Sequence, residues 1–113
     1  MILTRALLQE MMLPTTQQVD TIRDLLNSRI LHVAGLGVAE IQLSMYNIHC
    51  LNADLENMVP VDKVPAATRI VLMGYMANHI SVDLLVRGCE LQAFYPTDDL
   101  SDRETIVCIS WGP

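Results

Sequence analysis

The sequence is poor in aromatic residues, which make up 4% of its 113 residues. Hydrophobic residues nevertheless reach 51%, so the apolar excess consists of aliphatic side chains and seven methionines. A chain of this size has a limited interior, and surplus apolar side chains tend to lie at interfaces. Methionine suits adaptable contact surfaces as well as gaps in a core. The composition therefore favours a homo-oligomer or an obligate complex with another protein.

Basic residues are also few, with seven lysines and arginines against 13 acidic residues and a formal charge of −6. They are scattered along the chain, and no two are adjacent. Nucleic acids and anionic membrane surfaces are bound by clustered positive charge. The sequence therefore argues against both kinds of partner.

Long apolar runs are missing as well. No stretch approaches the roughly 18 uninterrupted apolar residues of a membrane span. The N-terminal segment MILTRALLQEMMLP contains Arg5 and lacks the cleavage site of a signal peptide. We therefore expect a cytoplasmic protein without membrane attachment, in which Cys50, Cys89 and Cys108 stay reduced. An odd number of cysteines also fits poorly with a closed disulfide framework.

Known catalytic and ligand-binding motifs are absent. The sequence contains no Gly-x-Ser-x-Gly elbow, no His-Glu-x-x-His and no phosphate-binding loop. The cysteines lack the short spacing of structural zinc sites. The acidic turn at 98–104 lacks the central glycine of a calcium-binding EF-hand loop. The sequence thus predicts no catalytic residue, no metal site and no cofactor.

The adjacent pair His49 and Cys50 combines two reactive residue types. A cysteine nucleophile needs a base within hydrogen-bond reach, with both side chains converging. Neighbouring side chains point to opposite faces of a strand and diverge by about 100° in a helix. Cys50 would therefore need another base, such as His32 or His79. We favour a core cysteine beside a partly exposed histidine, and Cys50 stays a candidate reactive thiol.

Two helices are expected in the N-terminal part, about residues 3–31. An apolar-rich helix covers residues 3–13 and ends before Pro14. Thr15 and Gln18 then have the spacing of a capping box, which starts a second helix. Apolar residues at steps of three and four predict its buried face: Val19, Ile22, Leu26 and Ile30.

The remaining part, about residues 39–112, predicts mainly strands. Residues 41–51 alternate as a strand does, with a helix as the alternative. Residues 52–67 contain two prolines and predict a surface loop with a helical turn near Leu55. The apolar run 69–76 predicts a buried strand.

A β-hairpin is expected from residues 80–86 and 89–95, joined by Arg87 and Gly88. This register pairs Leu84 with Leu91 and places Leu85 and Phe94 on the opposite face. A final strand, 105–112, presents alternate residues to the core: Thr105, Val107, Ile109 and Trp111.

These elements predict a single α+β domain over residues 1–113, with two N-terminal helices packed on one face of a largely antiparallel sheet of about four to five strands. The other sheet face mixes apolar and polar residues and is a candidate for self-association. The candidate interface residues are Leu85, Phe94, Ile106, Met73 and Met76. We expect a non-enzymatic protein–protein interaction module, such as an adaptor, chaperone-like or regulatory subunit, acting as a homodimer or in a complex. The alternative is a small-molecule-binding domain or a cysteine-dependent enzyme that uses Cys50.

Overall fold

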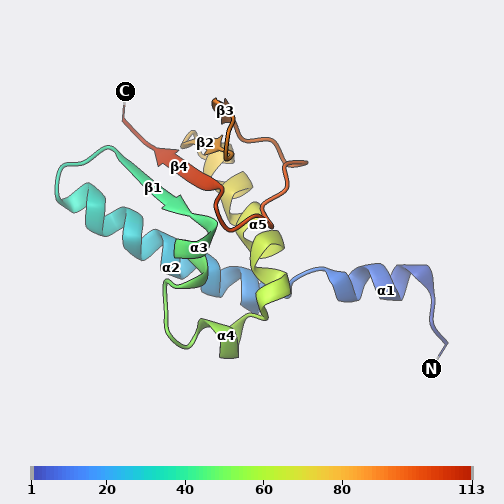
Figure 1. Ribbon diagram of the computed structural model, residues 1–113. Coiled ribbons are helices and arrows are strands. Elements are labelled where there is room, and N and C mark those ends of the chain that lie inside the picture. Colours follow the sequence, from blue (N-terminus) through green and yellow to red (C-terminus); the bar gives the residue numbers. More distant parts are fainter. Residues whose placement is uncertain (1, 113) are drawn as a thin grey trace.

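A computed structural model describes residues 2–112 and combines helices with one four-stranded sheet (Figure 1). The strands are all antiparallel to their neighbours, in the order β1-β4-β2-β3. Their bounds are β1 Glu40–Ser44, β2 Ser81–Leu85, β3 Leu91–Ala93 and β4 Ile106–Ser110. The helices are α1 Arg5–Met12, α2 Thr16–Gly35, α3 Met45–His49, α4 Leu55–Met58, the 3-10 turn η1 Val61–Lys63 and α5 Val64–Ala77. The predicted α+β class with an antiparallel sheet is confirmed.

The helical layer on the sheet consists mainly of α2 and α5, with α2 against β1 and α5 against β2 (Figure 1). The predicted capping box of α2 is present, because Thr15 and Gln18 each accept a backbone hydrogen bond from the other. The Tyr75 hydroxyl of α5 donates to Asn27 Oδ1 of α2 at 2.6 Å. Burial raises the pKa of Tyr75 to about 12. The two helices therefore share a polar link beside their apolar contact.

The first helix, α1, extends away from this layer (Figure 1). Its N-cap is Thr4, and it ends at Met12 with Leu13 as the C-cap, so that the helix stops before Pro14, as the sequence predicts. None of its side chains is buried, in contrast to α2. α1 is therefore a formed helix that adds nothing to the core.

The buried strand predicted over residues 69–76 is wrong, because these residues belong to α5. Pro65 lies in the first turn of α5, where its missing N–H costs no helical hydrogen bond. A continuous apolar run does not distinguish a buried strand from a buried helix. The buried positions of α5 follow helical spacing: Val64, Ala67, Thr68, Val71, Leu72 and Tyr75.

Residues 41–51 contain both of the alternatives that the sequence left open. They are a strand up to Ser44 and a helix from Met45. Ser44 and Asn47 form a capping box that starts α3, so the change occurs at one residue. The helical turn expected near Leu55 is confirmed as α4, but the loop predicted over 52–67 is shorter, since η1 and α5 occupy its second half.

The predicted hairpin exists, but its register differs by one residue. Leu84 pairs with Gln92, and Leu85 pairs with Leu91. The turn closes as expected around Gly88, which has a φ of 76°. The strands are nevertheless joined by an odd number of residues, which reverses the faces of β3. Phe94 therefore points into the core, and the prediction that it lies with Leu85 on the open face is wrong.

The last strand, β4, lies between β1 and β2 at the centre of the sheet. Thr105, Val107 and Ile109 are buried, as the alternation predicts. Trp111 packs at the edge of the same core. Ile106 and Cys108 lie on the opposite, open face of the sheet, in register with Leu85 and Asp83.

Candidate functional site

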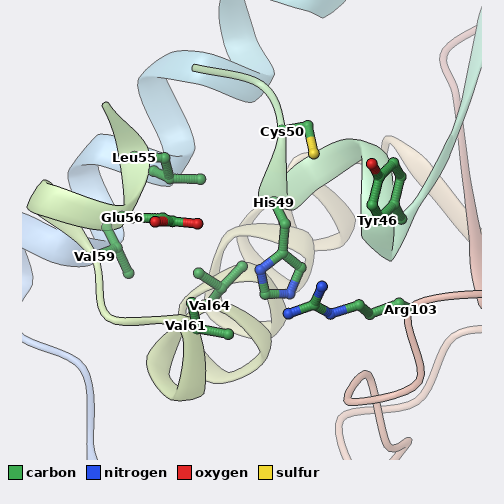
Figure 2. Close-up of a pocket in the computed structure, with 9 residues that line it drawn as sticks. All are labelled: Tyr46, His49, Cys50, Leu55, Glu56, Val59, Val61, Val64 and Arg103. Atoms are coloured by element: carbon green, nitrogen blue, oxygen red, sulfur yellow. The ribbon is translucent and has the colours of Figure 1, made fainter. Parts of the chain in front are cut away.

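A cavity of about 230 Å³ lies beside α3 (Figure 2). We call it the α3 pocket. Its floor is apolar, and polar side chains stand around it. It is lined by Tyr46, His49, Cys50, Leu55, Glu56, Val59, Val61, Val64 and Arg103.

The pocket is positioned by the way α3 is held. Met45 and Ile48 are buried in the core, which fixes the opposite side of this short helix. The Met45 N–H donates to the Thr105 carbonyl at 2.8 Å, and the Tyr46 N–H donates to the Arg103 carbonyl at 2.9 Å. These bonds use the free N–H groups at the start of α3 and draw the segment before β4 against it. Arg103 thereby comes to lie next to His49.

The electrostatics of the pocket favour the neutral form of His49. Burial lowers the pKa of His49 below its ordinary value of 6.5, and the positive charge of Arg103 lowers it further. In Figure 2 the His49 ring lies between Arg103 and the carboxylate of Glu56, which comes from α4. A neutral imidazole and a guanidinium above an apolar floor offer hydrogen-bond donors and an apolar surface to a small ligand.

Cys50 and His49 both line this pocket, but they do not form a dyad. In Figure 2 the Cys50 sulfur lies apart from the His49 ring, on the side of Tyr46. No hydrogen bond joins the two side chains among residues 2–112. Cys50 is exposed, so the expectation of a core cysteine is wrong, whereas His49 is partly exposed as expected. Neither His32 nor His79 lines the pocket.

The acidic turn at 98–104 uses its carboxylates locally. Asp98 accepts from the Tyr95 N–H, Asp99 from the Ser101 N–H and Asp102 from the Glu104 N–H. Hydrogen bonds from Ser101 lower the pKa of Asp99. Within the described part of the chain, no three His, Cys, Asp or Glu side chains lie close enough together to hold a metal ion.

The predicted interface residues fall into two groups on the surface. Leu85 and Ile106 pair on the open face of the sheet, where Leu91 extends the same row. Met73 and Met76 lie on the outer side of α5 and are 42% and 40% exposed. Phe94 is 1% exposed and belongs to neither group. The self-association role of the other four residues stays a prediction.

The most exposed apolar surface was not among the predicted sites. It is the α1 face, which we define as Leu8, Met11 and Met12 with Leu3 and Leu13 at its ends. These five side chains are between 48% and 73% exposed. The sequence carries a signal for this face, because apolar residues recur along one side of α1. The spacing of these residues does not show that the apolar side of α1 stays exposed in the folded chain.

Comparisons with known proteins give no family for this chain: no family model matches it, and no curated protein or solved structure matches it significantly. From Ile2 to Gly112, none of the helices has the length and apolar character needed to cross a membrane.

Proposed function

We propose that this protein is a cytoplasmic, non-enzymatic protein–protein interaction module that acts as a homo-oligomer or within a complex, with α1 as its binding element. The observation that carries the proposal is the α1 face, a row of apolar side chains that the rest of the chain leaves uncovered. Amphipathic helices commonly bind by laying their apolar side into a groove on a partner.

The length of α1 supports the same proposal. It has eight residues, whereas isolated helices shorter than about 12 residues are marginal in water. α1 buries no side chain within its own chain, so tertiary packing does not stabilise it. A partner surface that covers the α1 face would supply that packing.

The exposed area has the size of a binding surface. Burial of apolar surface stabilises by about 25 cal/mol per Å², and full burial of a leucine-sized side chain stabilises by about 3 kcal/mol. The apolar area of one such side chain is therefore about 120 Å². The α1 face then exposes roughly 400 Å², and contiguous apolar patches of this size often mark interaction sites. The formal charge of −6 and the scattered basic residues favour a protein partner over a nucleic acid.

The test is the mass of the protein in solution and its dependence on the α1 face. Light scattering after size exclusion should show a species larger than the monomer at high concentration. Leu8→Glu should shift it toward the monomer, because a carboxylate would enter an apolar contact. Gln9→Glu, on the polar side of the same helix, is the matched control. A monomer at every concentration, with no partner recovered from lysate through α1, contradicts the proposal.

The α3 pocket supports a second candidate, a small-molecule-binding domain or a cysteine-dependent enzyme that uses Cys50. The observation in its favour is that Cys50, His49 and Arg103 line one cavity. An activated Cys50 should react with iodoacetamide near neutral pH much faster than free cysteine does. Labelling of Cys50 no faster than that of the exposed Cys89 would remove the enzymatic form of this candidate.

A further inference from the structure

The α3 pocket contains two opposite charges that do not pair with each other. Arg103 and Glu56 both line it. Within residues 2–112, neither of these side chains forms an ion pair or a hydrogen bond with another residue. By contrast, Arg23 on α2 pairs with Asp20. The Arg103 and Glu56 side chains are exposed at the edge of the pocket, so a ligand can reach both of them.

The acidic neighbours of Arg103 in the sequence are engaged elsewhere. Asp102 accepts a hydrogen bond from the Glu104 N–H, and the Glu104 carboxylate pairs with Arg87. The positive charge of Arg103 is therefore not cancelled by an ion pair with either neighbour. Its field extends into the pocket, because burial and then the charge of Arg103 lower the pKa of His49.

Glu56 reaches the pocket from the opposite side. It lies in the first turn of α4, which is anchored because Leu55 and Val59 are 1% and 0% exposed. In Figure 2 the Glu56 carboxylate points toward the His49 ring, and the Arg103 guanidinium lies on the other side of that ring. The negative and the positive charge therefore stand at two ends of one cavity.

The surface of the pocket between these charges is apolar. Its floor is formed by Leu55, Val59 and Val64, all of which are buried. The neutral form of His49 adds no charge to it. Ligand sites commonly combine such an apolar lining with a few placed polar groups. A positive end, an apolar middle and a negative end are complementary to a molecule with a carboxylate and an ammonium group at the two ends of an aliphatic chain.

We infer that the α3 pocket binds a small aliphatic zwitterion of the ω-amino acid class, with its carboxylate on Arg103, its ammonium group on Glu56 and its methylene groups over the apolar floor. This inference rests on the second candidate function, in its small-molecule-binding form, and is independent of α1. Arginine suits the carboxylate end, because its guanidinium donates two parallel hydrogen bonds to a carboxylate.

Size and charge select this class of ligand. A cavity of about 150 Å³ holds one benzene molecule, so the 230 Å³ of the α3 pocket suits a chain of about five carbons with its two charged groups. A simple carboxylate would leave Glu56 without a partner, and a simple amine would leave Arg103 without one. In an α-amino acid both charged groups are bonded to the same carbon, so they do not reach both sides of the His49 ring.

Titration with 5-aminopentanoate, followed by the amide signals in nuclear magnetic resonance spectra of the full chain, tests the inference. The amides of Tyr46, His49 and Arg103 should shift, with a dissociation constant in the millimolar range, as expected for a ligand of this size. Pentanoate lacks the ammonium group, and pentylamine lacks the carboxylate. Each should bind at least about tenfold more weakly. The isomer 2-aminopentanoate, an α-amino acid, should also bind more weakly by about this factor.

Two variants assign the ends of the ligand. Arg103→Gln should weaken the binding of 5-aminopentanoate by about tenfold or more. Glu56→Gln should abolish the preference for 5-aminopentanoate over pentanoate, a change that a purely structural role of Glu56 would not produce. The matched controls are Asp54→Asn, two residues before Glu56, and Arg29→Gln on α2. Neither residue lines the pocket, so both variants should bind within about twofold of the native protein. The dispersion of the amide signals shows that each variant is folded.

The outcomes separate this inference from the proposed functions. If no amide around the pocket shifts with any of the four compounds at about 50 mM, the inference is wrong. If pentanoate binds as tightly as 5-aminopentanoate, the pocket takes a monocarboxylate: the inference is wrong, while the small-molecule-binding candidate stands. Equal binding of 2-aminopentanoate would overturn the placement of the two charges at opposite ends. None of these results bears on α1, whose role is tested by light scattering.

Discussion

α1 and α2 follow one another in the sequence, and each begins at a threonine whose side chain caps its first turn. Only α2 enters the core, where Val19, Ile22 and Leu26 are buried. The α1 face has the same kind of side chains and covers nothing. An amphipathic pattern thus identifies a helix and its apolar side, but the surface that covers this side depends on the rest of the molecule, or on another molecule.

The largest expected difference between the two helices comes from removing one leucine from each. Leu26→Ala leaves a cavity in a site that is fully buried, and we expect the free energy of unfolding to fall by about 3 kcal/mol. Leu8→Ala should change it by less than about 0.5 kcal/mol in the monomer. Urea denaturation at a concentration too low for association measures both. Equal losses would mean that α1 packs on the core in solution.

The two capping threonines give a smaller and closer comparison. Thr15→Ala removes the acceptor for the Gln18 N–H, and we expect a loss of about 1 kcal/mol from the global stability. Thr4→Ala removes the acceptor for the Leu7 N–H but should leave the melting temperature of the monomer unchanged. Its effect should be confined to faster hydrogen exchange in α1. Loss of global stability in Thr4→Ala would contradict the independence of α1.

The smallest effect is expected at His49, which lies in α3 and so outside both α1 and α2. The pKa of His49 is lowered in the folded chain. As the pH falls below about 6.5, the His49 imidazole is therefore protonated in the unfolded chain before it is protonated in the folded chain. The stability contributed by neutral His49 is present above pH 6.5 and is lost as the pH falls toward the folded-state pKa. The unfolding free energy of the native protein should therefore drop more between about pH 7 and pH 5 than that of His49→Gln. Curves for the native protein and His49→Gln that run parallel between pH 7 and pH 5 would contradict the assignment.

The sequence predicts best where several local signals agree. In α2, a capping box precedes apolar residues at helical spacing, and both features are confirmed. In 69–76 the apolar residues form a nearly continuous run, so neither the strand period nor the helix period stands out, and the predicted buried strand is wrong. Pro65 lies in the first turn of α5, a position that proline favours, but in the sequence it resembles a loop signal.

The functional surfaces were less predictable because they depend on long-range contacts. The β2–β3 connection, residues 86–90, has an odd number of residues instead of the expected even number. This difference reverses the faces of β3 and moves Phe94 from the expected interface to the core. The α3 pocket is lined by residues of α3 and α4 and by Arg103, which is about fifty residues away in the sequence. Backbone hydrogen bonds from the start of α3 hold the segment that contains Arg103, and no local sequence pattern predicts them. The geometric argument against a dyad of His49 and Cys50 agrees with the separation of the Cys50 sulfur from the His49 ring in Figure 2.

The position of β4 has a consequence for how the chain is made. β4 is the last strand in sequence, yet it lies between β1 and β2 and pairs with both. Until residues 106–110 have been synthesised, no strand lies between β1 and β2. Leu43 of β1 and Val82 of β2 therefore cannot yet form part of one apolar sheet face. Pairing at such long sequence separation is slow compared with helix formation. The helices can therefore form during translation before β4 is available, whereas the sheet is completed only once residues 106–110 have joined β1 and β2.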